Sequence, residues 1–499
     1  MTDPTAPEAP IPDTPITVIR NAAWAVVWNA EAGRHEYARG VDVVFQGDRI
    51  LSADGPWTGP ADAEIDGRER MVMPGFVDVH SHPSFETMLK GLTEEVYSPK
   101  FYMSSLYEFL TLFEIDEEGM RASTQVALAE LLQSGVTSLC DISFAHEGWL
   151  DGLAATGIRA FAAPMFRNGP WKTANGHSVY YELDEARGEE SMKAAMACLD
   201  EAAKHPSGRV SGVVSPSQID TCFEGLLREA MQEAEARDLP FTIHAAQGVI
   251  EFNEMIRRHG VTPIRWMEDI GILNERTLIG HGIFLDSHPQ VGWTTSSDDL
   301  GLIADAGASV AHCPTVFVRR GISLQHFSAY QERGVNMTIG TDTHPQNMVE
   351  ELKTAIYVAR TISGNAAKPT AEALFHAATV GGAKALRRDD IGKIEPGAKA
   401  DLVLVDITHA SLRPLRDPVR ALIFSGGERP IRDVYVDGRK VVEDGRAVFI
   451  DYEDAMVRVE AAQKRSMDLV HTRDWAGRSA DAAMPPVFPI RGHNRPAGQ

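Results

Sequence analysis

The chain has few cysteines and no segment that would mark it as secreted or membrane-bound. Its four cysteines, Cys140, Cys198, Cys222 and Cys313, lack CxxC spacing, which is typical of reduced thiols in a cytoplasmic protein. The first residues are polar and proline-rich, without the basic and apolar regions of a secretory signal. No apolar run approaches the roughly 18 residues of a membrane-spanning helix. We therefore expect a cytoplasmic protein with no membrane partner.

Basic residues are scarce relative to acidic ones. The sequence has 48 Lys and Arg against 70 Asp and Glu, a net charge of −22. Nucleic-acid binding needs a basic surface that displaces counterions, so no nucleic-acid partner is expected. The H-x-E and P-C-x-x-C pair of zinc-dependent base deaminases is also absent. With 43% hydrophobic and 24% charged residues, the composition is that of a globular enzyme, and we expect a small-molecule substrate.

Strand-like and helical stretches alternate between residues 74 and 391. The strand-like runs are residues 75–80, 136–142, 158–164, 210–216, 241–244, 277–281, 308–312 and 335–340. Helical periodicity occurs between them, at residues 117–133, 191–204, 225–237 and 348–363. Eight such units predict an α/β fold, a (β/α)8 TIM barrel, whose catalytic residues lie at the carboxyl ends of its strands.

The segments flanking the barrel have a different sequence pattern. Residues 16–73 and 392–450 contain short β-like runs and turns, so we expect both to pair into one small composite β-sandwich. Residues 1–15 are predicted to be disordered. Residues 451–499 are predicted to form a C-terminal helix over 451–469 and a tail that is extended or disordered.

Histidine and aspartate residues end several of the predicted strands. The first strand ends in His80 and His82, whose side chains point to the same face and can bind one metal ion. Later strands end in His244 and His281, and the last is followed by Asp342. Imidazole and carboxylate ligands around one divalent ion, with an open position for water, form a catalytic metal site.

These motifs resemble those of the amidohydrolase superfamily, in its branch of cytosine deaminases and atrazine and triazine hydrolases. The segments that carry the resemblance are residues 74–82, 244–246, 280–282, 310–314, 339–342 and 392–403. The resemblance implies a metal-dependent (β/α)8 barrel that hydrolyses C–N bonds. It also implies a homo-oligomer, a dimer or larger.

The same resemblance assigns roles to the strand-end residues. His80, His82, His244 and Asp342 would hold one divalent metal ion per chain, and His281 would either complete the coordination or hold the nucleophilic water. Zn²⁺ is the expected ion, although Fe, Co or Mn suit the same ligands. No lysine ends the fourth strand to bridge a second metal.

Two positions depart from the pattern of the deaminases. Those enzymes place a proton-shuttling Glu three residues after the strand-five His, where this chain has Gln247, and a substrate-binding His after strand four, where it has Ser217 and Gln218. Glutamine cannot carry a proton at neutral pH. We therefore predict hydrolysis of an amide, urea or carbamate C–N bond outside a ring, with Asp342 moving the proton and Gln247 orienting the substrate carbonyl. Deamination of a triazine, pyrimidine or purine is the alternative.

A narrower resemblance involves the last two strands of the barrel. Residues 313–321 and 340–345 are similar to the branch that contains phenylurea and thiocarbamate hydrolases. This resemblance implies a small apolar or aromatic substrate, such as a phenylurea-like compound.

Several further residues are candidates for contact with the substrate. Two long loops, residues 84–112 and 167–187, carry aromatic residues, including Trp171, that either line an apolar pocket or pack the loops or a subunit interface. His312 either faces the pocket or fills the core, and His344 follows Asp342 in the last loop. The neighbouring Arg319 and Arg320 either bind a substrate carbonyl or carboxylate or lie at the surface. Cys313 is predicted to be a core residue.

Overall fold

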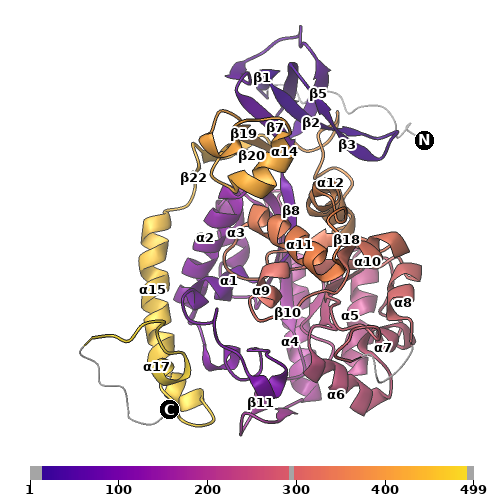
Figure 1. Cartoon of the computed structure of the whole chain (residues 1–499), viewed down its shortest axis with the longest axis vertical. Helices are drawn as coiled ribbons and strands as arrows, with labels where there is room; N and C mark the ends of the chain where they lie inside the picture. The colour runs from indigo at the N-terminus through magenta and orange to yellow at the C-terminus, as the bar shows by residue number, and fades with distance from the viewer. Residues whose placement is uncertain (1–13, 292–296, 492–499) are drawn as a thin grey trace.

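The structure is a computed structural model that describes residues 14–291 and 297–491. A barrel of strands and helices forms the main body, and a small β domain covers one end of it (Figure 1). Most of the predicted N-terminal disorder, at residues 1–13, lies outside the described residues. Among the described helices, none combines the length and the apolar character that crossing a membrane would take.

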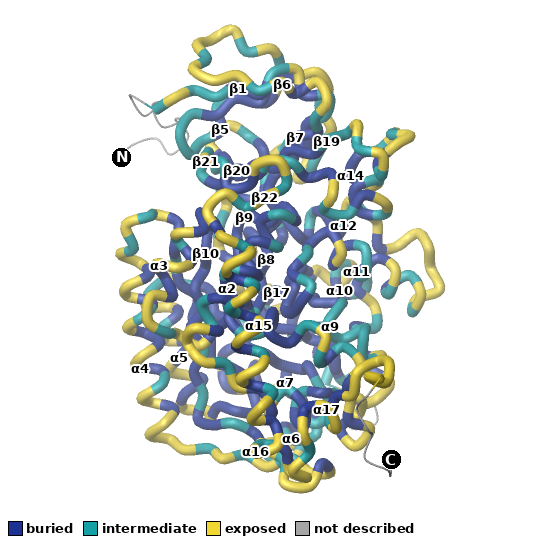
Figure 2. The backbone as a smooth tube through the Cα atoms, turned by 90° about the vertical axis from the view of Figure 1, so that its left-hand side faces the viewer, coloured by how far each residue is buried: buried dark blue, intermediate teal, exposed yellow. Residues whose placement is uncertain are grey.

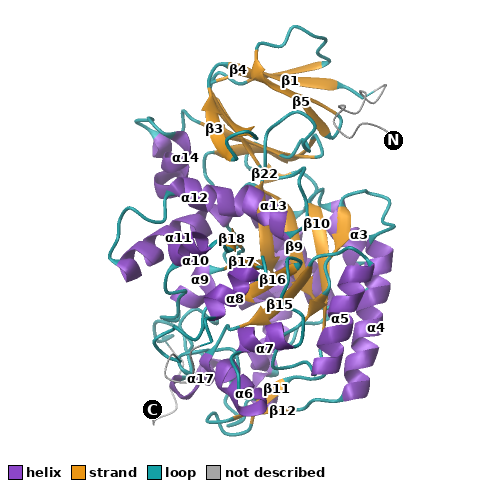
Figure 3. Cartoon of the chain, turned by 90° about the vertical axis from the view of Figure 1, so that its right-hand side faces the viewer, coloured by secondary structure: helices purple, strands orange, loops and turns teal. Residues whose placement is uncertain are grey.

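The predicted (β/α)8 barrel is present, with parallel strands surrounded by helices (Figure 3). Its strands are β8 (Phe76–Ser81), β9 (Val136–Ser143), β10 (Arg159–Phe166), β13 (Val210–Gly212) with β14 (Ser215–Pro216), β15 (Phe241–Ala245), β16 (Thr277–His281), β17 (Ser309–His312) and β18 (Asn336–Ile339). They form two half-sheets, β8 to β14 and β15 to β18. Parallel bridges from Ser81 to Asp342 and from Val214 to Phe241 join the half-sheets and close the barrel.

Helices pack around the outside of these strands, and the apolar core lies between the two layers. Figure 2 shows the barrel strands as buried, whereas the outer helices are exposed on one side. The helices are α2 (Glu117–Gln133), α3 (Trp149–Ala155), α4 (Glu185–Ala202), α5 (Glu224–Ala236), α6 (Val249–His259), α7 (Pro263–Asp269), α8 (Asp299–Asp305), α9 (Pro314–Val318), α10 (Phe327–Arg333), α11 (Met348–Ser363), α12 (Ala371–His376) and α13 (Gly382–Ala385). The predicted helix at residues 191–204 begins earlier, at Glu185, because the side chain of Asp184 caps it by accepting from Arg187 N.

Both flanks of the barrel contribute to the β domain. One sheet has the order β22-β21-β20-β19-β7-β2-β3 and the other β5-β4-β1-β6. The strands are β1 (Ile16–Ala22), β2 (Trp24–Asn29), β3 (Arg34–Ala38), β4 (Val41–Gln46), β5 (Arg49–Gly55), β6 (Ala63–Asp66), β7 (Arg70–Pro74), β19 (Leu402–Asp406), β20 (Ile431–Val436), β21 (Arg439–Glu443) and β22 (Arg446–Ala447). β7 and β19, far apart in sequence, pair antiparallel with Met73 opposite Val403.

A buried ion pair joins the barrel to the β domain. Arg159, at the start of β10, is 1% exposed. Its Nε and Nη2 atoms each donate to an oxygen of Asp401 at 3.0 Å, and it also contacts Asp437. The arginine is thus held by two carboxylates of the C-terminal flank.

The C-terminal segment packs on the barrel and differs from its prediction. The helix α15 (Tyr452–Asp468) runs beside α2 (Figure 1). A short helix, α16 (Val470–Arg473), follows it. The tail from residue 476 was expected to be extended or disordered, and its described part contains one helical turn, α17 (Ala480–Ala483). Ala480 and Met484 are buried, and Arg478 pairs with Glu108 at 2.9 Å. Apolar burial and this ion pair therefore hold the tail against the loop that follows β8.

Candidate metal centre

His80 occupies the most crowded position of the site, between two glycines. An ideal Cβ on Gly280 would lie 2.6 Å from His80 Cε1, and one on Gly340 would lie 2.7 Å from His80 Cβ. Real Cβ atoms do not approach so closely, so both positions require glycine. The Gly280-His281 and Gly340-Thr341-Asp342 motifs therefore make room for His80 as well as ending their strands.

The structure brings the five predicted strand-end residues together. His82 Nε2 lies 3.3 Å from His244 Nε2 and 3.4 Å from Asp342 Oδ1. His281 Nε2 lies 3.7 Å from Asp342 Oδ2, and His80 Nε2 lies 3.9 Å from Asp342 Oδ1. Four imidazoles and one carboxylate thus gather at the carboxyl ends of the strands, in two overlapping groups of potential ligands that share His80.

Backbone carbonyls orient two of these imidazoles. His82 Nδ1 donates to the Ile142 carbonyl, and His244 Nδ1 donates to the Ser217 carbonyl, both at 2.6 Å. With the proton on Nδ1, each Nε2 directs its lone pair toward the centre. A hydrogen bond from the other ring nitrogen to a backbone carbonyl is typical of histidines that bind a metal ion.

The donor set fits a divalent cation. Both ring nitrogens of His80 and Nδ1 of His281 are buried and have no hydrogen-bond partner among the described residues. Burial, with repulsion from neighbouring imidazoles, lowers the pKa of His80 far below its ordinary value and that of His244 to about 3. Neutral imidazoles are the form that binds metal, and a cation would satisfy nitrogens that are otherwise costly to bury.

Asp342 reaches the centre from an unusual backbone conformation. Its φ is +59°, in the left-handed region that few residues other than glycine adopt. Its N–H donates to the His80 carbonyl at 2.7 Å. This contact holds the strained residue at the seam where β18 meets β8.

Two residues near the centre were not identified as functional from the sequence. Asp78 accepts from Thr341 Oγ1 at 2.6 Å and from His80 N at 3.1 Å, so it ties β8 to the last strand. Cys313, predicted to be a core residue, is buried but lies in a group with His80, His281 and Asp342 whose potential ligand atoms are within 4.8 Å of one another. Burial raises the pKa of this thiol, which keeps it protonated and a poor ligand.

A cavity of about 230 Å³ opens over the centre and includes His82, His244, His281 and Asp342 in its lining. Its walls are mainly apolar and aromatic; they include Phe85, Tyr107, Phe144, Met165, Trp171 and Phe317. The Tyr107 and Trp171 rings, from the two long loops, lie 5.4 Å apart. Both loops therefore line the pocket and also pack together.

Besides His281 and Asp342, four of the proposed substrate or catalytic residues line this cavity: Trp171, Ser217, Gln218 and Gln247. Gln247 follows Ala246, whose φ is +53°. The buried Glu251 carboxylate accepts from the backbone N–H groups of Ala246 and Gln247, at 2.6 and 3.0 Å. This contact fixes the turn that places Gln247 in the cavity.

Three predicted substrate contacts are not among the lining residues. His312 packs against Phe327, with ring centroids 5.6 Å apart. Arg319 turns toward the loop after β18, where its Nη1 donates to the His344 carbonyl at 3.1 Å. His344 in turn contacts Glu94 through Nε2 at 3.0 Å. None of the three is therefore among the residues that line the cavity, and their substrate role stays a prediction.

Charged residues line the cavity in their place. Glu86, Arg167 and Arg320 are all part of the wall, and Arg167 directly follows the end of β10. Sequence reasoning considered Arg320 only as a member of a pair with Arg319. The two residues follow the short helix α9, and only Arg320 is among the residues that line the cavity.

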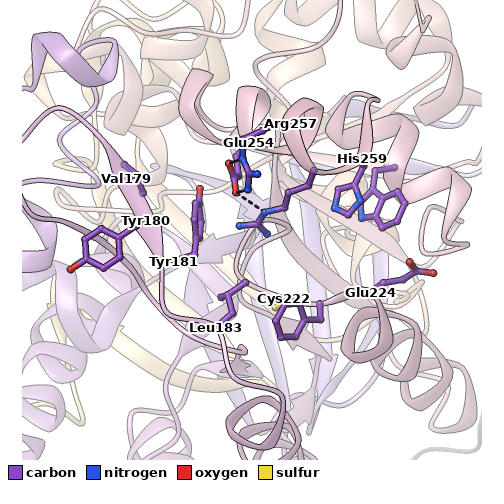
Figure 4. Close-up of a pocket in the computed structure, with 12 residues that line it drawn as sticks. Val179, Tyr180, Tyr181, Leu183, Cys222, Glu224, Glu254, Arg257 and His259 are labelled. Atoms are coloured by element: carbon purple, nitrogen blue, oxygen red, sulfur yellow. Dashed lines mark hydrogen bonds and ion pairs between the residues drawn. The ribbon is translucent and has the colours of Figure 1, made fainter.

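A second, larger cavity lies on the outside of the barrel, away from the metal centre. It has a volume of about 780 Å³ between the hairpin of β11 (Trp171–Thr173) and β12 (Val179–Tyr181) and helix α6 (Figure 4). Three of its charged groups are paired with one another: Glu254 contacts Arg257 at 2.7 Å and Arg258 at 2.6 Å. Arg258 also lies over the Tyr181 ring, 4.4 Å from its centroid.

A closed (β/α)8 barrel with histidines and a carboxylate around a cation position at its strand ends defines a metal-dependent hydrolase. The sequence pattern of the amidohydrolase family matches residues 71–441. The chain belongs to this family, and it is an enzyme that hydrolyses carbon–nitrogen bonds.

Relatives of known activity match most of the chain. A 5-methylthioadenosine/S-adenosylhomocysteine deaminase of Halobacterium salinarum is 28% identical over 425 residues, which cover 84% of this chain and 91% of the relative. A 5'-deoxyadenosine deaminase of Methanosphaera stadtmanae is 27% identical over 405 residues, covering 80% and 89%.

Solved structures share the fold. An adenosine deaminase from Xanthomonas campestris with bound zinc has a TM-score of 0.78 at 22% identity, covering 90% of this chain and 98% of that one. An atrazine chlorohydrolase from Arthrobacter aurescens, complexed with zinc, has a TM-score of 0.77 at 20% identity, covering 90% and 100%. At these sequence identities, the likeness shows a shared fold and nothing more specific.

Proposed function

We propose that the enzyme hydrolyses an amide, urea or carbamate C–N bond outside a ring, in a small aromatic or apolar substrate. The observation that carries this proposal is that Gln247 lines the cavity. The deaminases that the sequence resembles have a proton-shuttling glutamate at this position. A carboxamide cannot deliver a proton to a ring nitrogen. Hydrolysis of an acyl-type bond requires protonation of the leaving nitrogen alone.

The shape of the cavity supports a compact substrate. Its volume of about 230 Å³ is below the roughly 300–1,000 Å³ that is usual for drug-sized ligands. Tyr107, Trp171 and Phe317 offer it aromatic surfaces. An anilide or a phenylurea suits such walls better than a nucleoside, whose ribose hydroxyls need several polar partners.

The residues of the centre divide the chemistry among them. His80, His82, His244 and Asp342 would hold one divalent ion, with Zn²⁺ the proposed ion, and His281 would complete the set or hold the attacking water. The bound ion supplies the Lewis acidity that makes water nucleophilic near neutral pH. Asp342 accepts the proton of the attacking water and delivers it to the leaving nitrogen. Gln247 donates an amide N–H to the substrate carbonyl and so orients it.

Deamination of an N-heterocycle is the second candidate, and the names of the relatives favour it. Both relatives described above are deaminases of adenosine-type compounds. In this alternative another carboxylate must replace the missing glutamate. Glu86 lines the cavity and contacts Thr343 Oγ1, so it is the group that would carry the proton.

Product analysis by mass spectrometry on zinc-loaded enzyme separates the two candidates. One half of the panel contains aminated triazines, pyrimidines and purine nucleosides, and the other contains anilides, phenylureas and carbamates. We expect release of anilines or other amines and no ammonia from rings. Ammonia release from a ring, without cleavage of any acyl compound, would establish the second candidate instead.

A further inference from the structure

Arg320 has an unusual position in the wall of the catalytic cavity. Its Nη1 donates to the Val316 carbonyl at 2.5 Å, one helical turn earlier. Its Nε and Nη2 are buried and have no hydrogen-bond partner among the described residues. Within that part of the chain, no carboxylate lies within ion-pair distance of it. Burial, together with the charge of Arg319, lowers the pKa of Arg320 to about 10.

The unpaired atoms form one edge of the guanidinium group, and this chain shows what that edge binds. Arg159 donates from Nε and Nη2 to the two oxygens of Asp401, at 3.0 Å each. Arg465 donates from the same two atoms to Asp116, at 2.7 and 2.9 Å. The edge matches the geometry of a carboxylate, which it binds through two parallel hydrogen bonds.

The neighbouring acidic side chain does not provide the missing hydrogen-bond partner of Arg320. Glu86, which also lines the cavity, contacts Thr343 Oγ1, and its Oε2 lies 3.6 Å from His344 Nδ1. Its attraction to Arg320 acts only at longer range. A buried guanidinium without a close partner is costly, which indicates that a ligand supplies the partner.

An aromatic surface accompanies this cation. Val316 and Phe317 also line the cavity, and they precede Arg320 by four and three residues. Residues at these spacings share one face of a helical turn. Phe317 reaches the metal centre, since its ring lies 4.6 Å from that of His281. The face thus combines an apolar surface beside the centre with an anion-binding edge beyond it.

We propose that Arg320 binds a carboxylate of the substrate, so that the preferred substrates are aromatic acids with a hydrolysable nitrogen substituent. This assignment rests on the proposed function for the reacting bond, and it adds the chemical class of the remainder of the molecule. Phe317 contacts the ring, Arg320 binds the carboxylate, and the C–N bond lies at the metal centre.

Binding of benzoate and benzamide to zinc-loaded enzyme tests the assignment by calorimetry. We expect Arg320→Gln to weaken benzoate binding about 10- to 100-fold and to leave benzamide binding unchanged. Arg257→Gln is the matched control, because this arginine pairs with Glu254 outside the cavity and its side chain is 70% exposed. Equal benzoate affinity in wild type and Arg320→Gln would show that the acid binds the metal alone and would overturn the proposal.

A conservative variant and a metal assay guard against indirect effects. Zinc content must stay at the wild-type level in Arg320→Gln. If that variant misfolds, Arg320→Lys replaces it, since it keeps the charge but loses the two-atom edge. We expect an intermediate loss of benzoate affinity for Arg320→Lys, and wild-type affinity would contradict the paired geometry.

Hydrolysis of matched anilides separates this assignment from the proposed function. Acetanilides with a 4-carboxylate or a 4-carboxamide differ only in the group that Arg320 would bind. We expect wild type to favour the acid through KM, and Arg320→Gln to lose the preference. Absence of anilide hydrolysis with intact benzoate discrimination would refute the proposed function alone, whereas hydrolysis without discrimination would refute the role of Arg320.

Discussion

Arg159 and Arg320 lie at opposite ends of the barrel strands and have opposite environments. Arg159, the first residue of β10, is bound by Asp401 and Asp437. Arg320, beyond the end of β17, leaves the corresponding edge of its guanidinium without a partner. At the amino end the chain itself supplies the partners of its buried arginine, whereas at the carboxyl end one edge of the guanidinium is left for a ligand to bind.

Further buried groups near these two arginines show the same contrast. At the amino end, Asp401 also accepts from Asp437 N at 2.8 Å. At the carboxyl end, His80 and His281 retain ring nitrogens without partners. One end of the barrel is therefore built for stability and the other for binding, and substitutions at the two ends should have different effects.

The largest effect is expected from Asp342→Asn at the carboxyl end. The variant loses a metal ligand and the proton carrier, so kcat/KM should fall about 1,000-fold or more while the fold persists. Steady-state kinetics, zinc analysis and circular dichroism provide the measurement. Activity within tenfold of wild type would assign the proton transfer to another residue.

Arg159→Met should have the next largest effect, on stability. It leaves the buried carboxylate of Asp401 without its partner, which costs about 3–5 kcal/mol. The midpoint of chemical denaturation should fall, whereas the rate per folded molecule at low temperature should stay within about twofold of wild type. A stability loss below about 1 kcal/mol would mean that this ion pair does not hold the two domains together.

Gly280→Ala should weaken metal binding without removing a ligand. The added Cβ would lie 2.6 Å from His80 Cε1 and displace that ring, so zinc affinity should fall about 10- to 100-fold. Competition with a chromophoric chelator gives the affinity. Gly225→Ala, in α5, is the control, because its Cβ meets nothing within 4 Å; equal affinities in both variants would rule out this steric role.

The smallest change is expected for the stability of Arg320→Met. This variant removes a buried charge that has no close partner, so the free energy of unfolding should stay the same or rise by about 1 kcal/mol or less. The contrast with Arg159→Met, measured under the same conditions, isolates the effect of the environment. A loss above about 2 kcal/mol would reveal a structural role for Arg320 and weaken the comparison.

Much of the barrel was predictable because its strands end in residues that stand out. His82, His244, His281 and Asp342 each close an apolar run, which locates both the strand and its carboxyl end. The helix at residues 348–363 was predicted with its observed bounds, since its periodicity is strong and Asn347 caps it.

The remaining differences concern the direction of side chains and long-range packing. Arg319 and Arg320 are adjacent in sequence, and only the folded backbone after α9 decides which of them reaches the cavity. Asp78 lies within an apolar strand and gives no signal of its link to Thr341, 263 residues away. The proline and glycine content of the tail gave no sign of the buried contacts of Ala480 and Met484.

The most direct test of the account compares the products of wild type and Gln247→Glu on the same panel of ring amines and anilides. Gln331→Glu, in α10 and outside the cavity lining, provides the control for the same change. If Gln247 serves an acyl-type hydrolysis, wild type releases amines, and the restored glutamate adds no ammonia release from rings. Ammonia release from wild type, or its clear gain in Gln247→Glu, would show that the site is built for deamination.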